Sequence, residues 1–172
     1  MAVAMLLAAV LAAGAAYAAV TLTRSEAPAL APNVPAELAI ADVAAVARQV
    51  GHDVYGVASV PGTRLELTRG SRGEVWVRYL DGGAKAGDPR PAFLTVGTYR
   101  RTGALAAAQV AAKGARARSA TLPGGGVMLW SLDRPTSVYM ARPGGDLLVE
   151  VYSPDPKQAR GLVRGGAVAP LR

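Results

Sequence analysis

The chain has 172 residues and a mass of 17.5 kDa, which is enough for one small domain and a short appendage. It has no cysteine and a single histidine, His52. Disulfides, thiolate metal sites, iron–sulfur clusters, cysteine nucleophiles and sites needing two imidazoles are therefore excluded. The net charge is +7, but the arginines are scattered rather than grouped in a run, so we expect no nucleic-acid binding.

The first predicted element is an apolar helix over residues 2–22, a stretch without any charged side chain. At about 1.5 Å per residue this helix is about 31 Å long, close to the thickness of a bilayer's hydrocarbon core. We expect a transmembrane anchor over residues 1–24, or a signal peptide cleaved after Ala18 that leaves a secreted domain. Arg24 follows the apolar run and no basic residue precedes it, so a domain on the cytoplasmic side stays open as an alternative.

A spacer rich in proline and alanine follows over residues 25–35, with the sequence SEAPALAPNVP. Its prolines favour extended backbone and exclude a stable helix, so we expect this segment to be poorly packed. From Pro35 the apolar residues recur at helical spacing as far as Val50, and Gly51 ends this predicted helix. We place the extracytoplasmic α+β domain over residues 36–172.

After His52 the period of the apolar residues changes from helical to alternating. The predicted strands cover residues 53–59, 64–69, 74–80, 92–99, 126–132, 137–142 and 146–152, and two further helices cover residues 103–113 and 155–163. Short connections favour antiparallel neighbours. The pattern predicts an α+β fold in which about three helices pack on one face of a mainly antiparallel sheet.

Neither glycine-rich stretch matches a nucleotide-binding loop. Residues 82–87 have the glycine spacing of a Walker A motif, but Asp88 and Pro89 stand where that motif needs Lys and Ser or Thr. Residues 124–126 lack the third glycine of a dinucleotide fingerprint and precede a strand instead of a helix. We interpret the first stretch as a surface loop and the second as a turn.

The alternative to a binding protein is a small exported hydrolase that acts on an envelope polymer through His52 or a carboxylate pair. No serine has a Gly-x-Ser-x-Gly context, and no two carboxylates stand at metal-ligand spacing. We therefore predict no catalytic residue, no metal ligand and no cofactor.

One face of the predicted sheet combines aromatic and charged side chains. If the valines and leucines of each strand face the helices, alternation places the residues between them on the opposite face. The candidate binding surface consists of Arg64, Trp76, Arg78, Glu150 and Tyr152. These residue types carry much of the energy of protein interfaces, which favours a binding surface. The competing interpretation is a solvated sheet face with cross-strand ion pairs, such as Arg78 with Glu150.

Two stretches, VRYLDGGAKAGDPRPAFLTVGTY (77–99) and RPTSVYMARPGGDLLVEVYSPDP (134–156), carry a resemblance to known proteins. They resemble a group of small, N-terminally membrane-anchored proteins of high-GC actinobacteria. The resemblance implies an exported domain tethered to the membrane and adds no catalytic residue. We expect a non-catalytic binding or interaction domain of the cell envelope, whose partner is another protein or an envelope polymer.

Overall fold

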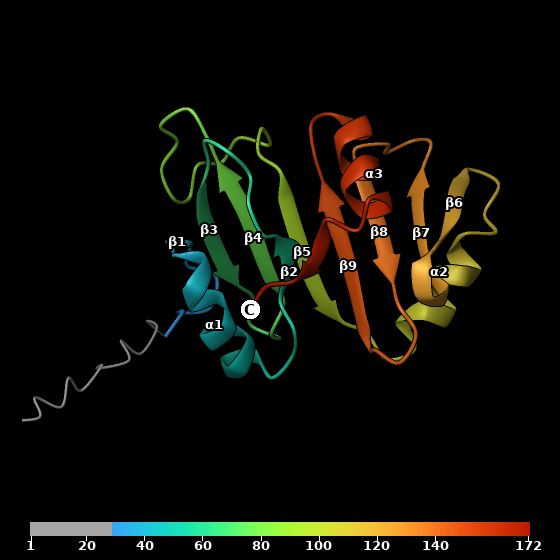
Figure 1. Cartoon of the computed structure of the whole chain (residues 1–172), viewed down its shortest axis with the longest axis horizontal. Helices are drawn as coiled ribbons and strands as arrows, with labels where there is room; N and C mark the ends of the chain where they lie inside the picture. The colour runs from blue at the N-terminus through green and yellow to red at the C-terminus, as the bar shows by residue number, and fades with distance from the viewer. Residues whose placement is uncertain (1–28) are drawn as a thin grey trace, which may run out of the picture.

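An eight-stranded antiparallel sheet organises the chain in the computed structural model, which describes residues 29–172 (Figure 1). The strands are β1 (Ala36–Glu37), β2 (Tyr55–Val57), β3 (Arg64–Arg69), β4 (Val75–Leu80), β5 (Thr95–Arg100), β6 (Ala117–Leu122), β7 (Gly126–Ser131), β8 (Ser137–Ala141), β9 (Leu147–Tyr152) and β10 (Val168–Pro170). The helices are α1 (Val43–Val50), α2 (Ala104–Ala111) and α3 (Pro156–Arg164), with short 3-10 turns η1 (Ile40–Asp42) and η2 (Pro123–Gly125). The fold is α+β, as the sequence predicts.

The large sheet consists of two halves that are consecutive in sequence. Its strand order is β1-β3-β4-β5-β9-β8-β7-β6, so residues up to 100 form one half and residues from 117 form the other. The halves join where β5 pairs with β9, with Thr95 opposite Tyr152 and Arg100 opposite Leu147. Figure 1 shows this pair in the middle of the sheet. A separate antiparallel pair, β10 with β2, returns the chain from the second half to the first.

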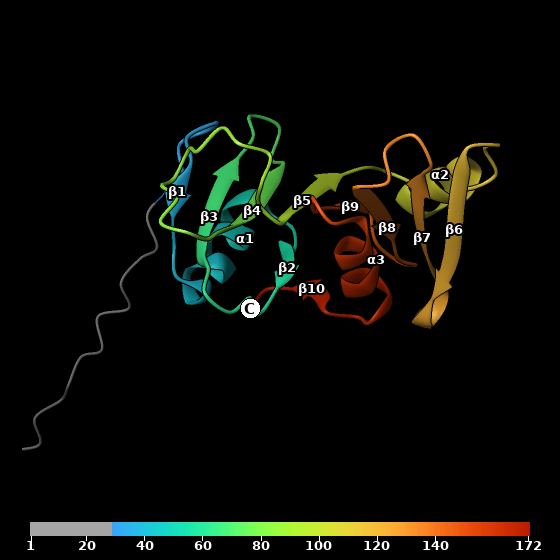
Figure 2. The same ribbon diagram turned by 90° about the horizontal axis from the view of Figure 1, so that it is seen from above.

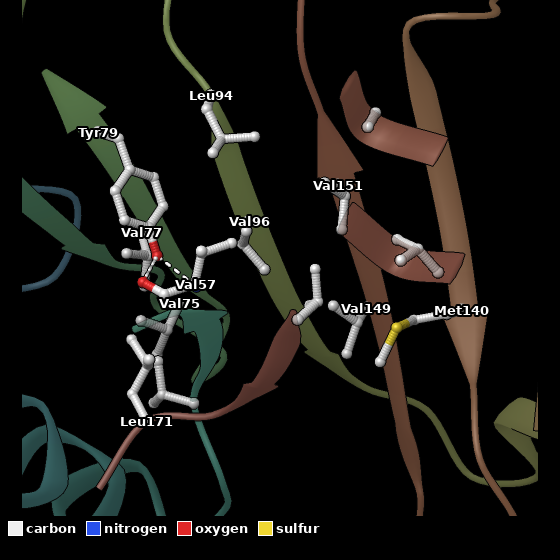
Figure 3. Close-up of a cluster of buried hydrophobic side chains, with 14 of the residues drawn as sticks. Val57, Val75, Val77, Tyr79, Leu94, Val96, Met140, Val149, Val151 and Leu171 are labelled. Carbon is white, nitrogen blue, oxygen red and sulfur yellow. Dashed lines mark hydrogen bonds between the residues drawn. The ribbon is translucent and has the colours of Figure 1, made fainter. Parts of the chain in front are cut away.

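The main core lies between one face of the sheet and α1, α3, β2 and β10 (Figure 3). Five valines of the central strands are at most 2% exposed: Val75, Val77, Val96, Val149 and Val151. Burying a side chain of this size contributes about 1.5–3 kcal/mol. Tyr79 points into the same core, where its hydroxyl donates to the Val57 carbonyl (2.8 Å) and accepts from the Val57 N–H (2.5 Å). This side chain therefore attaches β2 to the sheet.

Helix α2 packs on the other face of the sheet, and the prediction that all helices share one face is wrong for it. Its buried Ala104 and Ala108 contact Leu129, Tyr139 and Leu148, which alternation places opposite the valine core. Figure 2 shows α2 and α3 on opposite sides of the sheet. An alanine-rich helix has no strong polar stripe, so its sequence does not specify which face it covers.

The prediction that the spacer is poorly packed is wrong for its second half. Residues 1–28, including the predicted anchor and the start of the spacer, lie outside the described residues. Leu30 is only 5% exposed and belongs to the main core, and the Asn33 N–H donates to the Arg69 carbonyl at 2.7 Å. The predicted helix from Pro35 begins later, because Ala36 and Glu37 pair with β3. Residues 30–37 therefore run alongside β3, at the edge of the sheet, and are hydrogen-bonded to it.

Candidate functional site

The candidate binding residues share one face of the sheet, as alternation predicts. In the register, Trp76 on β4 lies opposite Gly97, Gly97 lies opposite Glu150, and Glu150 lies opposite Tyr139. Along the neighbouring row, Arg78 lies opposite Thr95 and Thr95 opposite Tyr152. This face lies open between two coverings, helix α2 over β7–β9 and the loop of residues 81–93 over β3 and β4.

The loop of residues 81–93, hereafter the cover loop, is fixed to the sheet rather than free at the surface. Side chains of the sheet make six hydrogen bonds to its backbone. Arg64 donates to the Ala84 carbonyl, Glu66 accepts from the Gly87 N–H (2.6 Å), and Tyr152 donates to the Pro91 carbonyl (2.6 Å). Arg78 donates to the Asp88 (2.7 Å) and Arg90 (3.3 Å) carbonyls, and Thr95 donates to the Phe93 carbonyl (3.1 Å). The Arg78 guanidinium also lies 5.0 Å from the centre of the Phe93 ring. Three candidate residues therefore hold the cover loop in place.

The ion pair expected between Arg78 and Glu150 does not form. Arg78 instead contacts Glu66, directly opposite on β3, at 2.9 Å, and Glu66 is fully buried. A cross-strand neighbour lies closer than a residue two strands away, and the buried carboxylate needs a cation. Glu66 is two residues from Arg64 on β3, so the same alternation places it on this face.

Beside the cover loop lies an open groove of about 520 Å³. Its lining includes six aromatic and prolyl side chains: Trp76, Phe93, Tyr152, Pro35, Pro89 and Pro91. Glu66, Arg78 and Asp88 also line it, but each is already hydrogen-bonded within the protein. The groove therefore presents flat apolar surfaces with few free polar groups. Arg64 does not line it; Arg64 pairs with Glu37 at the sheet edge instead.

A chain of polar contacts crosses four strands beside this groove, joining Trp76, Tyr99, Glu150 and Tyr139. The Trp76 indole N–H donates to the Tyr99 hydroxyl (3.0 Å), which donates to one Glu150 oxygen (3.0 Å), and the Tyr139 hydroxyl donates to the other (3.0 Å). An indole N–H can only donate, so the Tyr99 oxygen accepts and its own proton is directed to Glu150. All four side chains are half-buried.

Gly97 allows this chain of contacts to form. A Cβ atom at residue 97 would stand 2.7 Å from the Tyr99 hydroxyl and 2.9 Å from two of its ring carbons. The Tyr99 ring thus lies over the bare backbone of its own strand and meets Trp76 edge-on, with 6.0 Å between ring centres. Burial, then the nearby Glu150 charge, raises the pKa of Tyr99 above its ordinary value, and the same two causes raise the pKa of Tyr139.

Tyr99 and Tyr139 are site residues that the sequence analysis missed, although a signal was present. Thr95, Gly97 and Tyr99 alternate on one predicted strand, and Ser137, Tyr139 and Ala141 alternate on another. The same alternation that selects Glu150 therefore places both tyrosines beside it.

His52 has a structural position away from the groove. One ring nitrogen lies 2.7 Å from the Asp53 carbonyl and the other 2.8 Å from the Gly73 carbonyl. The imidazole thus joins the end of α1 to the turn between β3 and β4.

Within residues 29–172 no group of three His, Asp or Glu side chains could hold a metal ion. No helix of this part of the chain is long and apolar enough to cross a bilayer.

Comparisons with models of protein families, with curated proteins and with solved structures find nothing that matches this chain.

Proposed function

We propose that this protein is a non-catalytic binding domain, anchored outside the cytoplasm by its N-terminal segment, and that it binds a segment of a partner protein in the groove. The observation that carries the proposal is the groove's lining of aromatic and prolyl side chains on a sheet face that α2 leaves uncovered. Concave, mostly apolar sites with few polar groups are typical of ligand binding. Trp, Tyr and Arg are the residues that most often dominate binding energy.

The chemistry of the lining favours a protein segment over an envelope polysaccharide. A sugar polymer carries many hydroxyl groups, and each one left without a hydrogen bond on binding lowers the affinity. Most polar side chains of this groove are occupied internally: Arg78 and Glu66 by each other, Asp88 and Arg90 by each other, Thr95 by the Phe93 carbonyl, and Tyr152 by the Pro91 carbonyl. An extended segment with apolar or prolyl side chains matches the remaining surface better.

The groove offers little support for the hydrolase alternative. The Arg90 guanidinium and backbone N–H donate to the Asp88 carboxylate and lower its pKa to about 2, so this group is ionised at neutral pH and cannot act as an acid. Glu66 is buried and paired with Arg78. His52 does not line the groove.

A peptide selection with matched variants tests the binding function. Heptapeptides selected on the full-length chain are titrated by calorimetry against the wild type, Trp76→Ala and Trp130→Ala. Trp130 is the chain's other tryptophan, faces the opposite side of the sheet and lies under Arg160, so it is the matched control. We expect Trp76→Ala to weaken binding at least tenfold and Trp130→Ala to leave it unchanged.

Thr68→Lys gives a second test that leaves Trp76 in place, because it puts a charge among the apolar groove walls. We expect the same loss of affinity from this variant. Selected peptides that bind both groove variants as tightly as the wild type would overturn the proposal, as would a selection that yields no binder.

Reporter fusions test the proposed location. Arg172 is exposed, so alkaline phosphatase or green fluorescent protein can be attached there with little disturbance. We expect an active phosphatase and a dark fluorescent protein. Alkaline phosphatase becomes active only outside the cytoplasm, whereas green fluorescent protein that is exported unfolded does not become fluorescent there. The reverse pattern would place the domain on the cytoplasmic side.

A further inference from the structure

Glu150 is a half-buried carboxylate that forms no ion pair with any cation of residues 29–172. Residues 29–172 form five ion pairs, and none of them includes Glu150. Its two oxygens accept hydrogen bonds from neutral phenols only. By contrast, the more deeply buried Glu66 on the same face has Arg78 at 2.9 Å. A carboxylate held away from bulk water gains more from a cation than an exposed one does.

Two tyrosines flank this carboxylate along the sheet face, and Trp76 follows beyond one of them. Tyr99 and Tyr139 contact it directly, and Trp76 contacts the Tyr99 hydroxyl. A ring face attracts a cation through its quadrupole, by about 0.5–2 kcal/mol depending on how well water is excluded. A carboxylate beside such rings is a suitable receptor for an ammonium or guanidinium group. A carboxylate offers about four lone-pair positions, and the two phenols use two of them.

We propose that Glu150, with Trp76 and Tyr99, binds a lysine or arginine side chain of the partner segment. This inference rests on the proposed function, because the partner must first occupy the groove. The groove and the carboxylate are adjacent: Tyr152 lines the groove, and Glu150 is two residues along β9 on the same face, a distance of about 7 Å. A segment whose apolar residue fills the groove can therefore place a basic residue on Glu150.

The positive net charge of the chain does not oppose this site at contact distance. At physiological salt, charges separated by more than about 8 Å are largely screened, so the diffuse charge of +7 acts mainly on approach. The bound cation instead responds to the carboxylate at hydrogen-bond distance, where a charge-assisted contact is about twice as strong as a neutral one. The net charge of the chain slows the approach of a basic partner segment, while Glu150 stabilises the complex once the segment is bound.

Small probes of equal shape test the charge requirement. Butylguanidinium and butylurea differ in charge but little in size, and butylammonium represents lysine. Each is titrated into the full-length Trp130→Phe chain, in which Trp76 is the only tryptophan, and the fluorescence of Trp76 is followed. We expect a saturable change with butylguanidinium or butylammonium at a concentration at least tenfold below that needed for butylurea.

Glu150→Gln keeps the shape of the side chain and removes its charge, so we expect it to abolish the difference between butylguanidinium and butylurea. Asp133→Asn is the matched control, because it removes one negative charge from a pair with Arg116 that is exposed and away from the groove. This control should keep the full difference. Tyr139→Phe should reduce the difference while leaving the response to butylurea unchanged, since it removes only a hydrogen bond to the carboxylate.

Two results would overturn the inference: equal responses to the charged and neutral probes in the parent chain, or a difference that persists in Glu150→Gln. Both can be separated from failure of the proposed function. If selected peptides depend on Trp76 but not on Glu150, the groove binds a partner without a cation. If no peptide depends on Trp76, the binding function itself is wrong.

Discussion

Glu66 and Arg78 together decide whether the cover loop stays on the sheet. The carboxylate accepts from Arg78 and from the Gly87 N–H, and Arg78 also donates to the Asp88 carbonyl. Glu66 is fully buried, so these contacts replace the water that would otherwise solvate its carboxylate. A buried ion pair contributes little beyond what well-packed apolar residues would, but breaking one side of it leaves an uncompensated charge.

Arg78→Ala should therefore destabilise the domain by about 3–5 kcal/mol, which is the usual cost of orphaning one member of a buried pair. The double variant Arg78→Ala, Glu66→Gln should be more stable than Arg78→Ala alone, because the amide is neutral and still accepts from Gly87. Urea unfolding followed by circular dichroism measures both. A loss below about 1 kcal/mol for Arg78→Ala would mean that water reaches Glu66.

Asp88 makes stability depend on pH at acid values. Its pKa is about 2 in the folded chain because of the hydrogen bonds from Arg90, whereas an unfolded aspartate titrates near about 3.9. The folded-state pKa is the lower one, so this contribution is fully present above about pH 4 and is lost as the pH falls towards 2. Asp88→Asn should therefore lose less stability than the wild type between pH 5 and pH 2, measured by urea midpoints. An NMR titration of Asp88 with its midpoint near 3.9 would contradict this prediction.

Among the strands, β3, β4 and β9 lie close to their predicted bounds, and each has apolar residues at alternating positions that face the main core. Strand β6 was missed, because its sequence, ARSATL, has small and polar residues at most positions. The Arg78–Glu66 pair was missed for a different reason. Alternation places both residues on one face but does not give the register between β3 and β4. That register depends on the turn, which has five residues, Gly70 to Glu74, and sets Glu66 opposite Arg78.

The sequences of the strands, rather than the sequence of α2 itself, indicate which part of the sheet this helix covers. Val127 to Trp130 on β7 and Leu147 to Val149 on β9 are continuous apolar runs, which are typical of strands covered on both faces. The alternating strands β3 and β4 instead carry polar residues on the second face. Helix α2 covers the first kind of strand and leaves the second kind to the cover loop and the groove.

Gly97→Ala tests how much the stability of the domain depends on the absence of a side chain at residue 97, where the Tyr99 ring lies over the backbone of β5. The added methyl group overlaps the Tyr99 ring, so the ring must move away from Trp76 and Glu150. We expect a loss of about 1–3 kcal/mol, as for other overpacked sites. The indole N–H resonance of Trp76 should also shift, because its hydrogen bond to Tyr99 is lost. An unchanged resonance would mean that the ring adapts without breaking the contact.

Gly161→Ala is the control for this substitution and should have the opposite sign. Gly161 lies within α3, where an added Cβ meets no atom within 4 Å. Alanine restricts the unfolded chain and favours helix, so we expect a gain of about 0.5–1 kcal/mol in urea unfolding. Destabilisation here would imply a contact above α3 that the fold does not contain.

On the scale of the whole molecule, the pairing of β5 with β9 unites two consecutive halves of the chain. Their six matched positions run from Thr95 opposite Tyr152 to Arg100 opposite Leu147. The valine core continues across this junction, and the β10–β2 pair links the halves a second time. The two halves are therefore expected to unfold together.

Native-state hydrogen exchange tests this cooperation. Amides in β5 and β9 should exchange only through global unfolding, since these strands are central and buried, whereas β1 and β6 are edges and should exchange through local opening. Adding urea should bring all central strands to one common opening free energy. Exchange of β5 and β9 as fast as β6 would show that the halves separate before either unfolds.

The side chains of the proposed receptor come from β4, β5, β8 and β9, which are also the innermost strands of the sheet. A receptor built on such strands changes shape little when it is occupied, so the entropic cost of complex formation falls mainly on the partner. Affinity should then increase with the rigidity of the ligand, whereas further rigidity of the protein should change it little. Closing a selected peptide into a ring, with its contacts kept, is the direct way to strengthen the complex.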